Sequence, residues 1–298
     1  EAAAKVLPEA KIRIYTEVGR WLNAHTPPVA TLGVTELGAL SYWSDRNAID
    51  FLGLVQPTHV DYVRRGDFLE ALLREQPDYL ALTGVNALYN ADPQTEPWFL
   101  QLYRSLAVFE DAAFWGSPVT VWERRGAPAI ADQTLAEGAF ELGRGWTIEA
   151  VTSSSVRLRA GEWLLVRLRL RAGPDLGPRN LNLQAVRIDG AHASPVASRA
   201  IETGLWRPGE VAWVSVPLMA AEDLGEGGYV LQARWEGDPQ SVTVGRVKVP
   251  PVAPATRPTR WVSLSPEVAV GAIHEPLAWC PHTFFNVANG MIFIWFTT

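Results

Sequence analysis

Few side chains in this sequence combine the residue types and spacing that catalysis or metal binding requires. The histidines lack the spacing of metal ligands, such as H-x-x-x-H; they are His25, His59, His192, His274 and His282. The single cysteine, Cys280, excludes a disulfide within the chain and a cysteine-based zinc site. The polar run 153–155, all serine, is not part of the G-x-S-x-G motif that exposes a nucleophilic serine. We therefore expect no catalytic residue, no metal ion and no cofactor.

Gly33 and Gly38 flank a predicted turn from a strand into a helix, an arrangement that phosphate-binding loops share. The G-x-G-x-x-G spacing is absent because Thr35 occupies the place of the second glycine, and no Walker A lysine follows. The sequence therefore argues against a nucleotide site.

Asp50 is the acidic residue that most needs an explanation, because it stands in an apolar run just before Gly53. A buried carboxylate must be paired or must accept backbone N–H groups, since burying it alone costs several kcal/mol. Its candidate partners are Arg46, Arg64 and Arg65. A structural role is the simpler interpretation and a catalytic role is the alternative. Glu36 is predicted to lie in the first turn of a helix, where the helix N-terminus favours a carboxylate.

Tryptophan is abundant, with 13 residues in the chain. Exposed indole rings on a β-sandwich can stack on sugar rings, which suggests carbohydrate contact. The candidates are Trp163, Trp206, Trp213 and Trp235. The alternative is that these rings fill the core or the interface between domains.

The first part of the chain alternates between predicted strands and helices. Apolar spacing predicts an amphipathic helix over 9–25, strands over 29–34, 48–54 and 78–82, and helices over 59–75 and 98–109. Thr35 is expected to cap the helix after the first strand. A further strand over 117–124 is expected to pair at the sheet edge. These elements predict a small βαβαβ layer.

From about residue 127 to 252 the helical period disappears and strands recur between Gly and Pro turns, which is typical of an antiparallel β-sandwich. In the strand predicted over 162–171, the even positions 164–170 are Leu or Val and should face the core. The opposite face, with Leu165, Arg167, Arg169 and Arg171, is expected to be mostly solvated. Further strands are predicted over 181–188, 211–218, 229–235 and 242–249.

The predicted fold class is therefore an α+β multidomain chain, a small α/β layer followed by an antiparallel β-sandwich. We expect an α/β domain over 1–126, the sandwich over 127–252, and a linker with a C-terminal segment of unknown structure over 253–298. The apolar stretch 284–296 is open to three interpretations: a docked strand, the edge of a second module, or a non-native end.

Composition excludes several partners. The net charge of −6 and the absence of a Lys/Arg block argue against binding to nucleic acid or to an anionic bilayer. No run reaches the roughly 20 apolar residues that span a bilayer. Because the sequence begins at Glu1 rather than Met, we expect a fragment or a processed product.

A set of spaced residues resembles a known family. It comprises Glu36, Gly38, Tyr42 and Ser44, then Asp50, Gly53 and Leu54, then the runs 65–67 (RGD) and 77–79 (PDY). Together they resemble the segment after the last membrane helix in bacterial polytopic glycosyltransferases of the C superfamily. These enzymes are similar to protein mannosyltransferases and lipid A aminoarabinose transferases. The resemblance covers roughly the first 125 residues. Strand openers in the second half resemble β-sandwich modules of some of the same proteins.

The resemblance implies the accessory soluble part of a membrane glycosyltransferase that takes sugar from a polyprenyl-phosphate donor. The family's catalytic membrane domain is missing from this chain, which we therefore expect to be non-catalytic. Expected partners are that membrane domain and either the polyprenyl-phosphate sugar or a glycan acceptor. The implied location is extracytoplasmic, on the periplasmic or cell-surface side, tethered to the membrane in the parent protein. The alternative is a stand-alone carbohydrate-binding or adhesion-type module, whose gene would begin with a signal peptide rather than with hydrophobic helices.

Overall fold

The computed structural model describes residues 2–83, 93–251, 284–288 and 291–295. The chain divides into two units, Glu1–Pro251 and Val252–Thr298. Within the second unit, β14 (Phe284–Ala288) and β15 (Met291–Trp295) form an antiparallel pair. The linker predicted from residue 253 lies outside the described residues up to 283.

The first part of the larger unit is an α/β layer. Its elements are α1 (Ala2–His25), β1 (Thr31–Val34), α2 (Ala39–Ser44), β2 (Asn47–Asp50), η1 (Pro57–His59), α3 (Val60–Arg64), α4 (Phe68–Glu75), β3 (Tyr79–Thr83), η2 (Pro93–Thr95), α5 (Pro97–Leu102), β4 (Tyr103–Phe109) and β5 (Val119–Arg124). The sheet order is β2-β1-β3-β5-β4. The pairs of β1 with β2 and β3 are parallel, whereas β5 pairs antiparallel with both β3 and β4.

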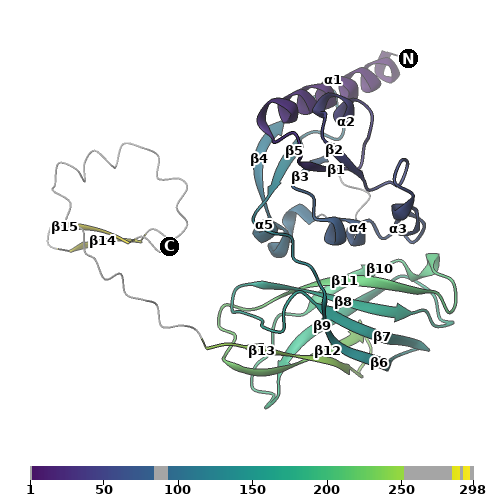
Figure 1. Cartoon of the computed structure of the whole chain (residues 1–298), viewed down its shortest axis with the longest axis vertical. Coiled ribbons are helices and arrows are strands. Elements are labelled where there is room, and N and C mark those ends of the chain that lie inside the picture. Colours follow the sequence, from purple (N-terminus) through teal and green to yellow (C-terminus); the bar gives the residue numbers. More distant parts are fainter. Residues whose placement is uncertain (1, 84–92, 252–283, 289–290, 296–298) are drawn as a thin grey trace. The chain divides into compact units, whose positions relative to one another are not determined.

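The helices cover both faces of this sheet. Figure 1 shows α1 and α2 on one face and α4 and α5 on the other. The chain steps from β1 to β2 in one direction and from β2 to β3 in the other, so right-handed crossovers place their helices on opposite faces. The buried stripe of α1, which includes Ile14, Val18 and Leu22, packs on the sheet. Gly19 lets α2 approach, since a Cβ there would lie 2.7 Å from the Leu40 carbonyl oxygen.

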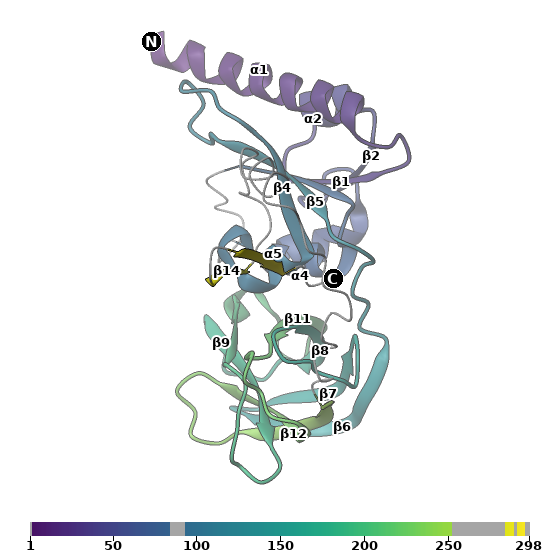
Figure 2. The same cartoon turned by 90° about the vertical axis from the view of Figure 1, so that its left-hand side faces the viewer.

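Several predicted elements were wrong in extent. The helix predicted over 59–75 is interrupted after Arg64 by a turn in which Gly66 has φ +66°, a conformation that an α-helix does not accept. The helix predicted over 98–109 ends at Leu102, because residues 103–109 instead pair with β5 as the long antiparallel strand β4 (Figure 2). Strand β5 consequently lies inside the sheet rather than at its edge.

The start of the layer also differs from the prediction in two details. The helix after β1 begins at Ala39 with Gly38 as its N-cap, so Thr35 does not cap it and Glu36 precedes it. The second strand ends at Asp50 rather than continuing to residue 54, because the chain turns there.

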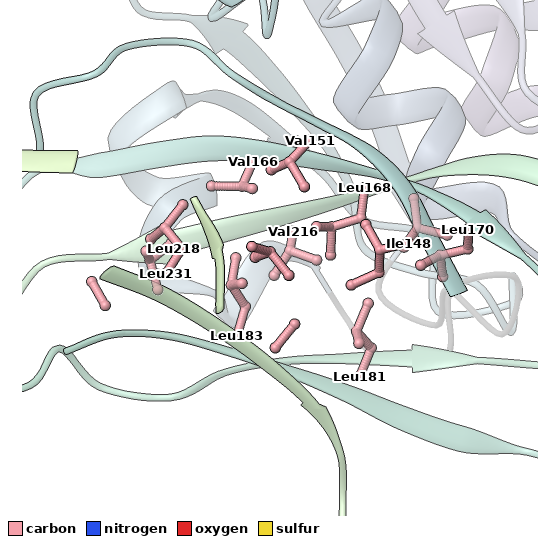
Figure 3. Close-up of a cluster of buried hydrophobic side chains, with 14 of the residues drawn as sticks. Ile148, Val151, Val166, Leu168, Leu170, Leu181, Leu183, Val216, Leu218 and Leu231 are labelled. Atoms are coloured by element: carbon pink, nitrogen blue, oxygen red, sulfur yellow. The ribbon is translucent and has the colours of Figure 1, made fainter. Parts of the chain in front are cut away.

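The rest of the larger unit is the predicted β-sandwich. Its elements are β6 (Gln133–Gly143), β7 (Trp146–Ser153), β8 (Trp163–Arg171), β9 (Arg179–Arg187), β10 (Ala197–Ile201), η3 (Thr203–Leu205), β11 (Val211–Met219), β12 (Gly227–Trp235) and β13 (Val242–Val249). One sheet has the order β10-β9-β12-β13 and the other β11-β8-β7-β6, and the pairs are antiparallel. Leucine and valine side chains from both sheets meet in the core (Figure 3). The predicted fold class is confirmed.

Strand β8 shows how the sandwich meets the α/β layer. Its core-facing residues, Leu164, Val166, Leu168 and Leu170, are at most 1% exposed, as the alternation predicted. The expectation that the opposite face is mostly solvated was wrong at two positions. Leu165 is 2% exposed and belongs to the apolar cluster of α4 and α5, and Arg167 contacts Glu70 of α4. This face of the sheet is covered because the α/β layer packs on it.

Candidate functional site

The turn over residues 50–55, called the Asp50 turn below, is built around a buried carboxylate. Asp50 is 0% exposed; its Oδ1 accepts the backbone N–H of Leu52 at 2.9 Å and its Oδ2 that of Val55 at 2.8 Å. None of the predicted arginines is its partner. Arg46 donates to carbonyl oxygens at the end of α1, and Arg64 contacts Glu210. The hydrogen-bond donors that the buried Asp50 carboxylate requires are therefore backbone N–H groups.

Two more residues hold the Asp50 turn closed. His59 is 0% exposed, and its Nδ1 lies 2.8 Å from the Asp50 carbonyl oxygen while its Nε2 lies 3.2 Å from Oε1 of Glu75. Gly53 has φ +72°, and a Cβ there would lie 3.1 Å from the backbone nitrogen of Val60. Sequence reasoning missed His59, whose only signal was its position nine residues after Asp50.

The first residues of the resemblance follow the carboxyl end of β1 and continue into α2. Glu36 forms an ion pair of 2.8 Å with Lys11 of α1, Gly38 has φ +82°, and Tyr42 is 77% exposed. In open α/β sheets, ligands bind outside the carboxyl ends of the parallel strands, so Glu36 and the Asp50 turn lie where a ligand site is expected. Yet Glu36 and Asp50 are both engaged. Exposed apolar side chains also lie at this edge, with Leu54 73% and Val55 68% exposed.

The third segment of the resemblance, residues 65–67, lies between α3 and α4 and contacts the sandwich. Arg65 and Asp67 are 6% and 7% exposed, and the Asp67 carboxylate pairs with Arg199 of β10. A Cβ on Gly66 would lie 3.1 Å from Cδ1 of Leu205. Glycine is therefore required both for the left-handed conformation and for the close approach to the sandwich.

A buried ionic cluster holds α4 against β8 and β11. Glu70 is 0% exposed and accepts Nη2 of Arg167 at 3.0 Å, the backbone N–H of Ser215 at 2.6 Å and the Ser215 hydroxyl at 3.1 Å. Burial raises the pKa of Glu70, and the charge of Asp67 raises it further, against the opposing effects of Arg167 and Arg199. In this cluster each carboxylate is paired with an arginine of the sandwich, Glu70 with Arg167 and Asp67 with Arg199.

A second ion pair adjoins this cluster. Glu210 pairs with Arg64 and Arg65, and it also accepts the backbone N–H of Arg207 at 2.9 Å. Burial acts to raise the pKa of Glu210, but the hydrogen bonds from Arg64 and Arg207 outweigh it and lower that pKa. The Glu210 carboxylate thus contributes ion pairs to the contact between the α/β layer and the sandwich.

The four candidate tryptophans differ in burial. Trp206 and Trp235 are 3% and 1% exposed, and both rings pack on Trp146 inside the sandwich. Neither offers a ring face to a ligand in this conformation. Trp163 and Trp213 are half-buried on the α/β-facing side, where Trp163 packs against the apolar cluster of the α/β layer and Trp213 lies beneath the guanidinium of Arg167.

A groove of about 530 Å³ lies between the α/β layer and the β-sandwich. One wall is β10 with the residues just before it, the second is the end of β11 with the residues after it, and the third is the start of α5. Trp98 and Gln101 face it from α5, and the carboxylates of Glu96 and Glu222 belong to its lining. The sequence contained no signal for this groove, because it exists only where the layers meet.

Within the described residues, no three His, Cys, Asp or Glu side chains gather as metal ligands would. The described helices include none with the length and apolarity of a membrane span.

The first part of the chain matches a protein family model. A family model described as Domain of unknown function (DUF8728) matches residues 5–135, which include the α/β layer and the first residues of β6. No curated protein matches the chain. A solved structure titled "Crystal structure of the C-terminal domain of wzt" is 13% identical over 39% of this chain and 77% of that chain, with a TM-score of 0.27. This likeness is too small to assign a fold or a function.

Proposed function

We propose that this chain is the accessory extracytoplasmic part of a membrane glycosyltransferase that takes sugar from a polyprenyl phosphate. Its role is to pack over the catalytic membrane domain and to orient the acceptor or the lipid-linked donor. The observation that carries the proposal is the Asp50 turn. Three of the residues that resemble the family, Asp50, Gly53 and Leu54, belong to a turn whose carboxylate accepts two backbone N–H groups, rather than to a reactive pocket.

The surface of this turn supports a docking role. Leu54, Val55 and Val60 are 73%, 68% and 51% exposed, although their neighbour Asp50 is fully buried. Adjacent exposed apolar side chains on a firmly held turn are typical of a surface that contacts another domain or a membrane. The proposed partner is the membrane domain of the parent protein.

The second candidate is a stand-alone carbohydrate-binding or adhesion-type module without catalysis. It draws support from Trp163 and Trp213, whose rings are half-buried and therefore partly accessible. Both rings already contact other side chains, which weighs against this candidate. A sugar, for example, would compete with Arg167 for the ring of Trp213.

The test uses the full-length product of the native gene in its own membrane, supplied with a radiolabelled polyprenyl-phosphate sugar. We expect the double variant Leu54→Asp/Val55→Asp to lower sugar transfer about tenfold or more, since it places two charges in a docking surface. The matched control is Val29→Asp, at a position 89% exposed in the loop before β1, which should retain transfer. Thermal melts of the purified variants verify that each still folds.

Two results would contradict the proposal. One is turnover of the polyprenyl-phosphate sugar by the purified chain alone, abolished by a point change within it. The other is a native gene that encodes a signal peptide and no hydrophobic helices, which would favour the carbohydrate-binding module.

A further inference from the structure

The groove between the layers runs along an unpaired strand edge. Strand β10 is the outermost strand of its sheet and pairs with β9. In an antiparallel sheet, alternate residues of an edge strand direct their N–H and C=O groups away from the sheet. Residues 195–200, which include most of β10, line the groove. The groove therefore runs beside backbone groups of the kind that extend a sheet, among which the Ala200 carbonyl also accepts a hydrogen bond from Nη1 of Arg199 at 3.4 Å.

The opposite wall is closed to the same kind of pairing. Strand β11 is also an edge strand, but Pro217 lies within it and lines the groove. Proline has no N–H to donate to a neighbouring strand, so β11 cannot continue a ladder at that position. Of the two edges, β10 is the one that is able to receive a new strand.

The β10 wall of the groove carries mostly small side chains. The side chains of β10 in the groove include Ala197, Ser198 and Ala200, which are small enough for another backbone to approach. Strand β10 has 5 residues, and a paired strand of that length spans about 17 Å. The groove volume of about 530 Å³ is within the range of ligand sites, roughly 300–1,000 Å³.

The charge of the groove selects among peptides. Its ionisable side chains are Glu96, Arg199 and Glu222. The guanidinium of Arg199 is already paired with Asp67. Among the described residues, Glu96 and Glu222 form no ion pair, so their carboxylates give the described lining of the groove a net negative charge. A phosphate group would be repelled and a basic side chain attracted.

We propose that this groove binds an extended peptide segment with basic side chains, which adds a strand to the free edge of β10. Backbone hydrogen bonds to β10 supply affinity, while Glu96 and Glu222 select for lysine or arginine. The proposal does not depend on the membrane glycosyltransferase function, because the groove is complete within the larger unit.

The probe is a random heptapeptide library displayed on phage and selected against the purified 298-residue chain. We expect enriched peptides to alternate apolar residues with lysine or arginine. Synthetic copies should bind the double variant Glu96→Lys/Glu222→Lys about tenfold or more weakly, which corresponds to about 1.4 kcal/mol. The matched control Glu137→Lys/Glu226→Lys makes the same change of charge at exposed sites outside the groove and should bind as the unmodified chain does.

A second measurement examines the backbone pairing without altering the protein. Peptides N-methylated at alternate residues lose the N–H groups that a ladder requires, so one of the two methylation registers should abolish binding. Binding that is unchanged in both registers would overturn strand addition. The absence of any peptide enriched over the Glu96→Lys/Glu222→Lys variant would overturn the proposal altogether. The proposal would also be overturned if the chain bound maltoheptaose but no peptide, and if those two substitutions weakened that binding. The groove would then be a glycan site.

Discussion

Replacing Arg167 with alanine tests whether the two layers are held together by a buried ion pair. Arg167 lies on β8, and its Nη2 is 3.0 Å from Oε1 of Glu70 on α4. The Arg167 side chain is 21% exposed and that of Glu70 is 0% exposed. The substitution Arg167→Ala leaves the Glu70 carboxylate buried without its arginine.

The magnitude follows from what remains around Glu70. Removing one partner of a buried ion pair costs about 3–5 kcal/mol, because an uncompensated charge is left in the interior. Ser215 still donates two hydrogen bonds to the carboxylate. Glu70 is also able to take up a proton, since burial raises its pKa. We therefore expect Arg167→Ala to lower the free energy of unfolding by about 2–3 kcal/mol at pH 7.

The sign of the pH dependence is fixed by the raised pKa of Glu70. A carboxyl group whose pKa is higher in the folded state binds its proton more tightly there, so its contribution to stability declines as the pH rises through that pKa. Arg167→Ala removes a charge that lowers this pKa, and the pKa rises further. The destabilisation by Arg167→Ala should therefore shrink as the pH falls from 7 toward the ordinary glutamate value of 4.5.

The assay is urea unfolding of the purified chain, followed by tryptophan fluorescence at several pH values. Arg169→Ala is the matched control on the same strand face, because Arg169 is 49% exposed and pairs with Glu149 at 3.4 Å. It should change stability by no more than about 0.5 kcal/mol. Leu168→Ala, on the core face, should cost about 2–5 kcal/mol at every pH, because it leaves a cavity rather than a charge.

A double-mutant cycle separates the ion pair from the contact of Arg167 with Trp213. In a Glu70→Gln background the cost of Arg167→Ala should be smaller, because no buried charge is left unpaired. The reasoning is refuted if Arg167→Ala costs no more than Arg169→Ala, or if its cost is the same at pH 5 and at pH 7.

Three further outcomes are expected from urea melts. Asp50→Ala should lower the free energy of unfolding by about 1–3 kcal/mol, because it leaves two N–H groups unpaired. The control Asp61→Ala, at a side chain that is 73% exposed, should lower it by less than about 0.5 kcal/mol. Equal effects would mean that Asp50 is not a structural acceptor. Gly53→Ala should be more destabilising than the control Gly209→Ala by about 1 kcal/mol or more. Both glycines have positive φ, but an added Cβ would meet another atom only at Gly53. Equal costs would exclude the steric contact. Hydrogen bonds lower the pKa of Glu210, so the stability that its carboxylate contributes to the fold should be present above about pH 4.5 and lost as the pH falls through the lowered pKa. Glu210→Gln should reduce this acid-induced loss of stability. An unchanged acid profile would contradict the docking role of that carboxylate.

The sequence alone was sufficient for the features that depend on local periodicity. The alternation in β8 predicted its core face, and the Gly and Pro turns between strands predicted a sandwich. The cost of a buried charge likewise required that Asp50 have donors, and it has them. These predictions succeeded because period-2 alternation and the desolvation of a carboxylate do not depend on what lies across the interface.

Features that depend on partners distant in the sequence could not be predicted in this way. The apolar spacing of residues 98–109 fits a helix, yet β4 forms from residue 103 because β5 offers it a hydrogen-bonding edge. Strands β6, β7 and β10 were not recognised, because their period-2 pattern is weak and their pairing depends on neighbours.

Tertiary structure also decided the chemistry of the site. Arg167, Arg169 and Arg171 are indistinguishable by sequence pattern, but only the docking of α4 buries Arg167 beside Glu70, 97 residues away. The same docking creates the groove along β10, whose walls come from three separate parts of the chain. A sequence records which side chains are able to carry charge or pack in a core, whereas the closeness of two faces depends on the docking of whole layers.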